Sequence, residues 1–345
     1  MKTISYKQQQ GFTLIEIMVA AVISLIILGG VAQVFLGNRD SYRLLQASSN
    51  VQETGRFGME FLVKDIRMAG YMGCASANNV NLTNNVDVTK TSDDVDNSVA
   101  NFDGTNSIIG YTYDTTFPTD LGNFDLTSSD VVQGTDVVFI QRASSCPGGD
   151  ILDHNQTSAQ YKIADNSQCQ IQQNDVVLLS DCANADIHGV TNSPGSTGTV
   201  NIAHAANLNK TPKLNNTYGP GSSMYKMTAM VYYIGFNPDN EPALFRRRLV
   251  GDSFVTEELV EGVYDMDILY GVDTNGDGVS NRYVSETDVG NWEGVVTVNT
   301  TLFTRSMQDG VTEQPITYNY NGASLTDNRL QRDFRFTTTI RNRVQ

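Results

Sequence analysis

A long apolar run near the N-terminus is the strongest pattern in this sequence. From Phe12 to Leu36 the only charged residue is Glu16, and the leader before the run carries Lys2 and Lys7 but no acid. A helix of about 25 apolar residues is long enough to cross the hydrocarbon core of a bilayer. The run therefore predicts a membrane-spanning helix, and a carboxylate inside such a helix usually has a function.

The helix is expected to continue beyond the apolar run. Residues 39–69 contain no proline, and their apolar side chains recur on one face of a helix at Phe57, Phe61, Leu62, Ile66 and Ala69. Because an apolar stripe is unstable in water, we expect this second half to dock on a globular head. Gly55 and Gly58 are expected to weaken the helix locally, and Gly70 and Gly73 to end it.

Strand patterns dominate the second half of the chain. They predict eight strands, at 137–142, 175–180, 227–236, 243–250, 254–259, 266–270, 295–305 and 334–340. Arg305, which ends one of them, is expected to face outward. Residues 76–130, rich in Asn, Asp, Ser and Thr, predict loops with short strands. Since few helical patterns separate the strands, the economical fold is α+β, with an antiparallel sheet packed on the N-terminal helix.

Composition and charge narrow the class of function. The 345 residues carry 23 Lys and Arg against 38 Asp and Glu, which gives a net charge of −15. Nucleic-acid binding relies on Lys and Arg to displace counterions, so we expect no direct nucleic-acid partner. Basic residues before the apolar run and an acidic body after it place the C-terminal part outside the cytoplasm.

The four cysteines fit an oxidising compartment such as the periplasm. Cys74, Cys146, Cys169 and Cys182 form no Cys-x-x-Cys pair, and the three histidines are not spaced as zinc ligands. Two disulfides are therefore predicted, and four cysteines allow three pairings. We favour Cys169 with Cys182, which would close a short loop, and Cys74 with Cys146, although the sequence does not choose among the three.

The segment from Gly11 to Glu16 resembles the class III signal of type IV pilins and pseudopilins. The resemblance implies that a prepilin peptidase cleaves between Gly11 and Phe12 on the cytoplasmic side, and that Phe12 becomes an N-methylated N-terminus. An ordinary secretory signal has its small residues after the apolar stretch rather than before it. An ordinary membrane anchor would leave the acid after Gly11 unexplained.

The same resemblance implies a role for Glu16 in assembly. In a filament the apolar helices pack together with little water, and a buried carboxylate there needs a partner. Members of the family use the amine of a neighbouring subunit's first residue, here Phe12, and such a pair fixes the axial register more than it adds stability. The alternative is an acid favoured only by the dipole at the start of a helix.

Four further segments resemble the PilW family of minor pilins: 65–74, 175–187, 258–273 and 334–342. The resemblance implies a low-abundance pilin that joins other minor pilins, primes type IV pilus assembly and remains at the pilus tip, where it can carry a large adhesin. The alternative is a minor pseudopilin of a type II secretion system. Twitching motility, adhesion and DNA uptake are all open as purposes of the pilus.

Together these patterns divide the chain into four parts. They are a cleaved leader (1–11), a transmembrane and filament-core helix (12–36), an amphipathic second half of that helix (37–70) and a periplasmic β-rich head (71–345). The expected partners are the prepilin peptidase, the inner membrane, other minor pilins, the major pilin and a tip adhesin.

An acidic loop in the head resembles the first half of a calcium-binding loop. Its oxygen donors stand at alternate positions, with glycine at the turn: Asp273, Asn275, Asp277, then the Val279 carbonyl and Asn281. The twelfth position, where the full motif has a bidentate glutamate, is Val284. The alternative is a simple hairpin turn, which Asn-Gly and Asp-Gly favour without metal.

Two short patterns could indicate a catalytic site or an anion-binding site, but we interpret neither of them in this way. Ser223 and Lys226 have the Ser-x-x-Lys spacing of penicillin-interacting enzymes, but the companion motifs are missing. We therefore expect a protein that is not an enzyme and has no certain cofactor. Three successive arginines, Arg246 to Arg248, alternate faces on a strand, so we expect them to pair with acids rather than to form an anion site.

Overall fold

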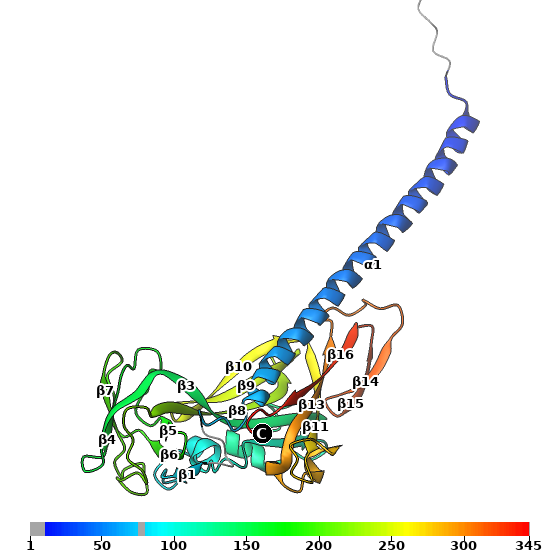
Figure 1. Ribbon diagram of the computed structural model, residues 1–345. Helices are drawn as coiled ribbons and strands as arrows, with labels where there is room; N and C mark the ends of the chain where they lie inside the picture. The colour runs from blue at the N-terminus through cyan, green and yellow to red at the C-terminus, as the bar shows by residue number, and fades with distance from the viewer. Residues whose placement is uncertain (1–10, 75–79, 345) are drawn as a thin grey trace, which may run out of the picture.

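The computed structural model describes residues 11–74 and 80–344. One long helix, α1 (Leu14–Arg67), projects from a large β-rich head (Figure 1). The predicted α+β class is confirmed, because the second half of the helix packs on the antiparallel strands of the head. Residues 1–10 of the predicted leader lie outside the described residues.

Helix α1 is continuous over 54 residues and buries only its C-terminal part. The buried positions begin at Ala47 and recur every three or four residues as far as Ile66. The predicted docking of this half is confirmed, with one correction: Phe57 is 39% exposed and lies outside the buried face. After Met68 caps the helix, Gly70 adopts a left-handed conformation with φ of +70° and donates its N–H to the Gln141 carbonyl.

Two glycines of α1 allow the helix to approach the head closely. A Cβ atom on Gly55 would lie 2.3 Å from the ring of Phe334, and one on Gly58 would lie 2.8 Å from the Leu302 side chain. Glycine has a cost in helix propensity, as expected from the sequence. At these two positions the cost is offset because no larger residue fits between the helix and the sheet.

The larger sheet has ten strands. They are β1 (Asn81–Asn84), β2 (Ile108–Tyr113), β3 (Thr135–Asn155), β4 (Gln160–Ile163), β5 (Val176–Ser180), β6 (Asn184–Gly189), β7 (Val200–Ala203), β8 (Ser223–Phe236), β9 (Pro242–Val250) and β10 (Ser253–Glu261). The strand order is β1-β6-β5-β8-β3-β4-β7, with β2 on β3 and with β9 and β10 beside β8. Only the pairing of β1 with β6 is parallel among the described strands.

A second, four-stranded antiparallel sheet follows in the sequence. Its order is β12 (Arg282–Val284), β11 (Val263–Val272), β13 (Val295–Arg305) and β16 (Gln331–Thr339). The hairpin of β14 (Ile316–Tyr320) and β15 (Ala323–Asp327) stands apart from it. A core that includes Ile66 of α1, Ile140 of β3 and Ile268 of β11 joins the helix to both sheets.

The described connections contain four short helical turns besides the single turn α2 (Asp93–Val95). They are η1 (Asp96–Ala100), η2 (Thr119–Phe124), η3 (Glu286–Asp288) and η4 (Trp292–Gly294). All eight predicted strands fall on observed ones. The region predicted as loops with short strands contains β1 and β2 together with α2, η1 and η2, and the helical turns were not expected.

Much of residues 146–222 forms a distal lobe inserted between two strands that pair directly, whereas β5 and β6 within this range belong to the larger sheet. Ser145 of β3 lies opposite Tyr225 of β8, and the chain between them folds around a small core of its own that includes Ile151, Tyr161 and Ile202. In Figure 1 this lobe, with β4 and β7, extends away from the base of α1.

The four cysteines form two disulfides, Cys74–Cys182 and Cys146–Cys169. The pairing that we favoured from the sequence is therefore wrong. Strand β5 separates Cys169 from Cys182, and five extended residues place the two ends of a strand about 15 Å apart. Cys182 instead lies in the β5–β6 turn beside the end of α1, with a Cα–Cα distance of 5.1 Å to Cys74.

Candidate assembly interface

The start of α1 carries a capping box formed by Thr13 and Glu16. The Glu16 carboxylate accepts hydrogen bonds from the Thr13 backbone N–H and hydroxyl, each at 2.9 Å, and the Thr13 hydroxyl accepts from the Glu16 N–H at 3.3 Å. These contacts satisfy donors that a helix start leaves free. Within a single chain, the Glu16 carboxylate is therefore bound to Thr13, the residue that caps the helix and directly follows Gly11 and Phe12.

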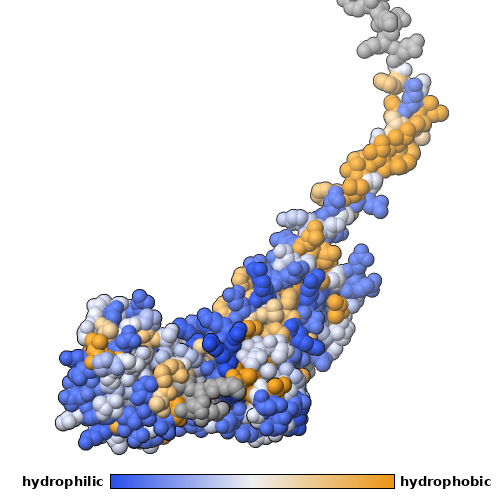
Figure 2. All heavy atoms as spheres, viewed as in Figure 1, coloured by the Kyte–Doolittle hydropathy of each residue, from blue (hydrophilic) through white to orange (hydrophobic). Residues whose placement is uncertain are grey.

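The first part of α1 exposes apolar side chains on all sides. Between Phe12 and Leu36 the exposed fraction of the large apolar residues runs from 48% to 85%. Figure 2 shows this stretch as an apolar rod outside the head, and the helix is long and apolar enough to cross a membrane. Apolar surface of this extent requires lipid or other helices around it.

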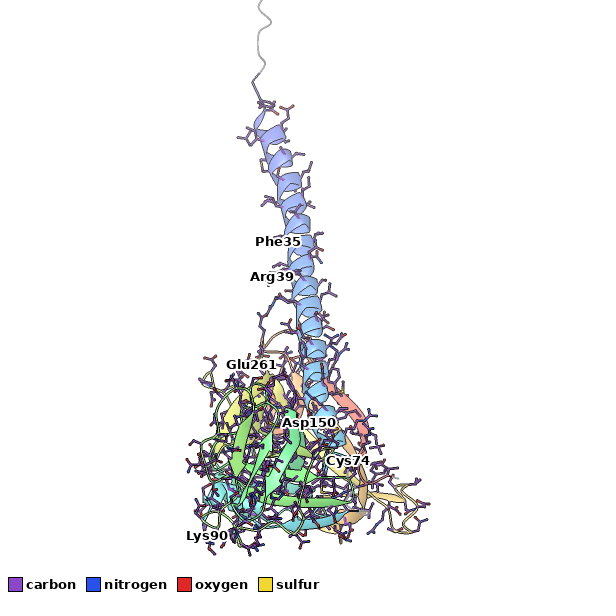
Figure 3. The ribbon with its side chains drawn as sticks, turned by 60° about the vertical axis from the view of Figure 1, so that its left-hand side comes forward. Phe35, Arg39, Cys74, Lys90, Asp150 and Glu261 are labelled. Carbon is purple, nitrogen blue, oxygen red and sulfur yellow. A yellow bond between two sulfur atoms is a disulfide. The ribbon has the colours of Figure 1, made fainter. Side chains whose placement is uncertain are left out.

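Charged residues appear where the helix approaches the head. Arg39 lies beside Asp40 at 3.4 Å, with both side chains more than half exposed, and Arg43 donates to the Asp309 carbonyl at 3.2 Å. Figure 3 shows Phe35 and Arg39 on the projecting part of the helix. The apolar rod therefore ends near residue 37, and the buried positions of the docked half begin at Ala47.

The docked half is held by a buried carboxylate. Asp65 is 3% exposed, and it receives hydrogen bonds from Arg142 at 3.0 Å and from the Tyr232 hydroxyl, with Arg246 at 3.5 Å. Burial, followed by the neighbouring Asp65 charge, raises the pKa of Tyr232, so its hydroxyl remains a donor. Because a buried charge requires its partners, this cluster fixes the rotation of α1 on the head.

The three successive arginines of β9 pair with acids, as predicted. Arg246 and Arg248 share Glu257 on the neighbouring strand β10, at 2.7 and 2.8 Å. Arg247 points to the other face and pairs with Asp125. These ion pairs link β9 to β10 through Glu257 and to the loop that contains Asp125. The three arginines therefore do not lie on one face of the sheet.

Arg305 corrects another expectation. Its side chain is only 5% exposed, and it bonds Glu241 at 2.8 Å and the Tyr318 hydroxyl at 2.9 Å. The β14–β15 hairpin supplies Tyr318 and Tyr320, and the Arg305 guanidinium lies over the Tyr320 ring at 4.6 Å. The alternation of residues along the strand could not predict that the β14–β15 hairpin covers Arg305, because the hairpin comes later in the chain.

The acidic loop between β11 and β12 is held by its own hydrogen bonds. The Asp273 carboxylate accepts hydrogen bonds from the backbone N–H groups of Asn275, Gly276 and Gly278. The Asn281 side-chain oxygen accepts hydrogen bonds from the backbone N–H and the hydroxyl of Thr274. The last position of the loop, Val284, belongs to β12 and pairs with β11. Hydrogen bonds and strand pairing thus account for this conformation, and calcium binding stays a prediction.

Within residues 11–74 and 80–344, the acidic loop included, no group of three or more His, Cys, Asp or Glu side chains is arranged to hold an ion. Ser223 and Lys226, the two residues of the Ser-x-x-Lys pattern, each contact a different aspartate. Lys226 pairs with the buried Asp175 at 2.7 Å, whereas Ser223 donates to Asp150 at 3.4 Å. A lysine engaged in this way is not positioned to activate the serine.

Three histidines far apart in the sequence meet inside the distal lobe. The Nε2 atoms of His154 and His204 are 3.2 Å apart, and Nε2 of His188 lies 3.1 Å from the Tyr161 hydroxyl. His154 Nδ1 accepts the Tyr218 backbone N–H at 3.0 Å, which requires the neutral ring. Burial, as the largest cause, lowers the pKa of all three histidines. Only the fold brings them together, so no sequence pattern could have found this cluster.

An exposed apolar helix with a capped acid at its start, fastened to an acidic head, is the architecture of a pilin-like subunit. Residues 6–32 match the family model for the prokaryotic N-terminal methylation motif. Residues 231–342 match the model of PilW, the type IV pilus-assembly protein W. The two resemblances drawn from the sequence are thereby confirmed: the chain is similar to the methylation motif over residues 6–32 and to PilW over residues 231–342, which supports a pilus-related protein. Neither a curated protein nor a solved structure matches it significantly.

The two matches include the start of α1 and part of the contact that holds α1 on the head. The first contains Gly11, Phe12 and Glu16, and the second contains Tyr232 and Arg246, which hold Asp65. Two of the four segments that resembled PilW, 258–273 and 334–342, lie inside the second match. Residues 33–230, which include the distal lobe, lie outside both matches.

Proposed function

We propose that this chain is a minor pilin that primes type IV pilus assembly in a complex with other low-abundance pilins and remains at the pilus tip. The observation that carries the proposal is the apolar rod, which the head leaves uncovered from Phe12 to Leu36. A surface of this kind suits two successive environments, first the inner membrane and then the bundle of helices in a filament.

Cleavage between Gly11 and Phe12 would leave the rod intact and give Phe12 a free amine. The Glu16 carboxylate, held by Thr13 in the single chain, then becomes available to the amine of a neighbouring subunit. Such a charge pair in an apolar bundle is strongly unfavourable if one partner is missing. It therefore selects one axial register between subunits, and the prepilin peptidase is a necessary earlier partner.

The head supports the role of a rare subunit. It combines a ten-stranded sheet, a four-stranded sheet and an inserted lobe, more structure than a repeated shaft subunit requires. The division into leader, filament-core helix, docked helix and periplasmic head belongs to this proposal. So do the partners: other minor pilins, the major pilin and a tip adhesin, in a pilus that serves twitching, adhesion or DNA uptake.

We further propose that the chain is not an enzyme, since the pilin-family matches point to a structural protein and the one catalytic pattern in the sequence is occupied by other contacts. A strain that carries Ser223→Ala should then have the same number of surface pili as one that carries the parent chain, at equal protein level.

Deletion of the gene tests the proposal. Surface pili should become scarce, while secretion of a type II substrate stays normal, and plasmid-borne wild-type chain should restore the pili. Normal pili with blocked secretion would assign the chain to the pseudopilins of type II secretion instead. Normal pili and normal secretion, in a strain shown to lack the chain, would contradict both assignments.

A further inference from the structure

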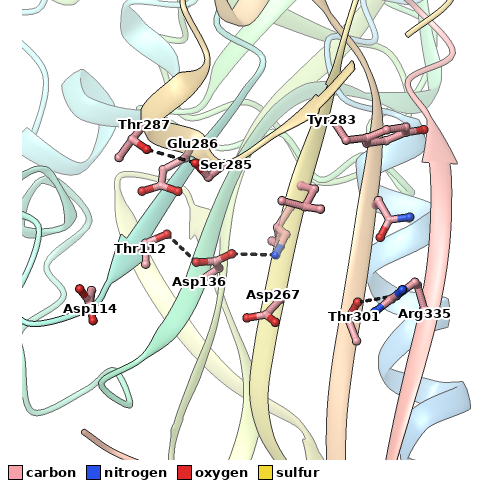
Figure 4. A pocket seen from close by; sticks show the side chains of 13 residues that line it. Thr112, Asp114, Asp136, Asp267, Tyr283, Ser285, Glu286, Thr287, Thr301 and Arg335 are labelled. Carbon is pink, nitrogen blue, oxygen red and sulfur yellow. Dashed lines mark hydrogen bonds between the residues drawn. The ribbon is translucent and has the colours of Figure 1, made fainter. Parts of the chain in front are cut away.

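The second sheet ends in a strand with one open edge. Strand β16 pairs with β13 and has no partner on its other side among the described strands. In Figure 4 it is the last strand of the sheet, at the label of Arg335, and α1 passes behind it. The Arg335 side chain itself lies against β13, where it donates to the Thr301 hydroxyl at 3.2 Å.

Every second residue of β16 turns its backbone groups toward this open edge. Ile340, directly after the strand, donates its N–H to the Val296 carbonyl on the β13 side at 2.9 Å. Because successive residues of an antiparallel strand turn their N–H and C=O groups to opposite sides, those of Arg335, Thr337 and Thr339 point away from β13. None of these three N–H groups donates to another residue that the structure describes.

Other strand edges of the head are protected, whereas this one is not. On β11 the free N–H groups of Met266 and Ile268 donate to the carboxylates of Asp265 and Asp136, each at 2.7 Å. Strand β10 has a register shift near its end. Strand β16 runs through nine residue pairs without a register shift and contains no proline. Since bulges and prolines are common protections of edge strands, the regular edge of β16 is suited to accept a further strand.

A groove of about 390 Å³ lies between this edge and the end of α1. Val63 and Arg67 of α1 line one side, and residues 337–339 of β16 line the other. Arg341 and Val344, which follow the strand, complete the lining. The groove therefore contains two arginines and no acid, beside backbone groups that have no partner.

Arg67 and Arg341 supply unpaired positive charge. Both are exposed, and neither side chain forms a salt bridge or a hydrogen bond within residues 11–74 and 80–344. In a chain of net charge −15 this contrasts with Arg246 and Arg305, which are matched with acids. The helix dipole favours a cation at Arg67, in the last turn of α1, but gives no reason for Arg341.

A buried hydroxyl without a partner also lines the groove. Thr338 is 4% exposed, and its Oγ1 atom forms no hydrogen bond with a described residue. The Thr337 hydroxyl, by contrast, accepts the Asn299 side-chain amide at 2.9 Å. A buried hydroxyl that lacks a partner is destabilising, and a polar group that enters the groove would supply one.

We propose that the open edge of β16 binds an extended acidic segment of a partner protein as an added strand. The segment hydrogen-bonds to the backbone of Thr337 and Thr339, and its carboxylates lie beside Arg67 and Arg341. A second copy of β16 is a poor occupant, because it would bring the arginines of two chains together. The inference goes beyond the proposed function, since it requires only the folded head with its docked helix.

Peptide binding to the full chain in uncharged detergent micelles tests this inference. The probe is a fluorescent, end-blocked Glu-Val-Glu-Val-Glu-Val-Glu peptide, with Gln in place of Glu in its neutral counterpart, and the readout is anisotropy. We expect the acidic peptide to bind saturably although the chain carries a net charge of −15. The neutral peptide should bind about tenfold more weakly, equivalent to about 1.4 kcal/mol. No saturable binding of the acidic peptide, or equal binding of the neutral one, would overturn the inference.

A matched pair of double variants tests the two arginines. Arg67→Gln with Arg341→Gln should weaken binding of the acidic peptide about tenfold. Lys162→Gln with Lys213→Gln removes the same charge from exposed positions outside the groove and should change the affinity less than about twofold. Equal losses in the two pairs would mean that only the total charge of the chain matters and would contradict the proposal.

A second pair of variants tests the added strand. Thr337→Pro and Thr337→Ala both remove the hydroxyl, but only proline removes the N–H at the open edge, and it breaks no hydrogen bond with β13. The alanine variant should bind the acidic peptide within about twofold of the parent chain, and the proline variant about tenfold more weakly. Equal binding by the two variants, with unchanged thermal unfolding midpoints, would rule out strand addition. The arginine variants, at exposed positions, decide the matter if the proline variant unfolds.

Discussion

Replacement of Asp65 by alanine tests how the helix is held on the head. The change removes the acceptor for Arg142 and for the Tyr232 hydroxyl, and it removes the charge that faces Arg246. All these groups lie at the helix–sheet contact, so the cost should appear as a lower free energy of unfolding of the head together with the docked helix.

The magnitude follows from what remains after the change. Removal of one partner from a buried ion pair typically costs about 3–5 kcal/mol. Arg142 keeps the Ser144 hydroxyl at 2.8 Å, and Arg246 keeps Glu257 at 2.7 Å, so neither arginine is left without a partner. We therefore expect the lower end, about 3 kcal/mol, most of it from the desolvated Arg142 and the orphaned Tyr232 hydroxyl.

Urea unfolding of the full chain in detergent micelles measures this loss. The single tryptophan, Trp292, packs edge-on against Tyr270 at 4.8 Å between ring centres and reports on the head core. Asp40→Ala is the matched control, because Asp40 forms an exposed pair with Arg39 and should contribute less than about 1 kcal/mol. A loss for Asp65→Ala no larger than that of the control would refute the view that this cluster holds the helix.

Three further predictions concern the stability of the head. Gly55→Ala places a Cβ atom against the Phe334 ring and should destabilise the chain by about 1–3 kcal/mol in the same urea assay, whereas Gly37→Ala, with no heavy atom within 4 Å, should be neutral or slightly stabilising; equal effects would contradict the close approach. Removal of the Cys74–Cys182 disulfide by paired alanines should cost about 5 kcal/mol, against about 3 kcal/mol for Cys146–Cys169, because the first closes a loop of 108 residues and the second one of 23; the reverse order would count against the loop argument. Acid should destabilise the distal lobe: the folded pKa of His204 is lowered to about 4 from 6.5, so the unfolded chain takes up protons first and stability falls as the pH drops from about 6.5 toward 4. Thermal unfolding midpoints across that range should decline in the parent chain and less steeply in His204→Gln, and parallel curves would exclude His204 as the cause.

Much of the fold could be predicted because its signals are local. The apolar run, the helical spacing up to Ile66 and the glycines after it placed α1 and its end. The strands were placed by alternation and turn residues, and the pairing of Arg246 with an acid followed from the same alternation. Gly55 was interpreted only as a weak point, since its contact with Phe334 joins residues far apart in the chain.

The remaining features depend on contacts that no local pattern encodes. The burial of Arg305 depends on the later hairpin that carries Tyr318, and the His154–His204 contact depends on the packing of the lobe. The disulfide pairing depends on the direction of β5, which carries Cys182 away from Cys169. The carboxylates of Asp136, Asp267 and Glu286 come from separate elements and line one pocket, so no local pattern indicated that they lie near one another.

Pilus number in a strain that carries Glu16→Gln in place of the natural residue tests the central claim most directly. Glutamine keeps the capping box with Thr13 and preserves the shape of the side chain, so the variant removes only the charge. The account predicts scarce surface pili at normal levels of processed protein, and restored pili in the same strain supplied with the wild-type chain. Full piliation by Glu16→Gln would show that no charge pair at this position is needed for assembly and would contradict the account.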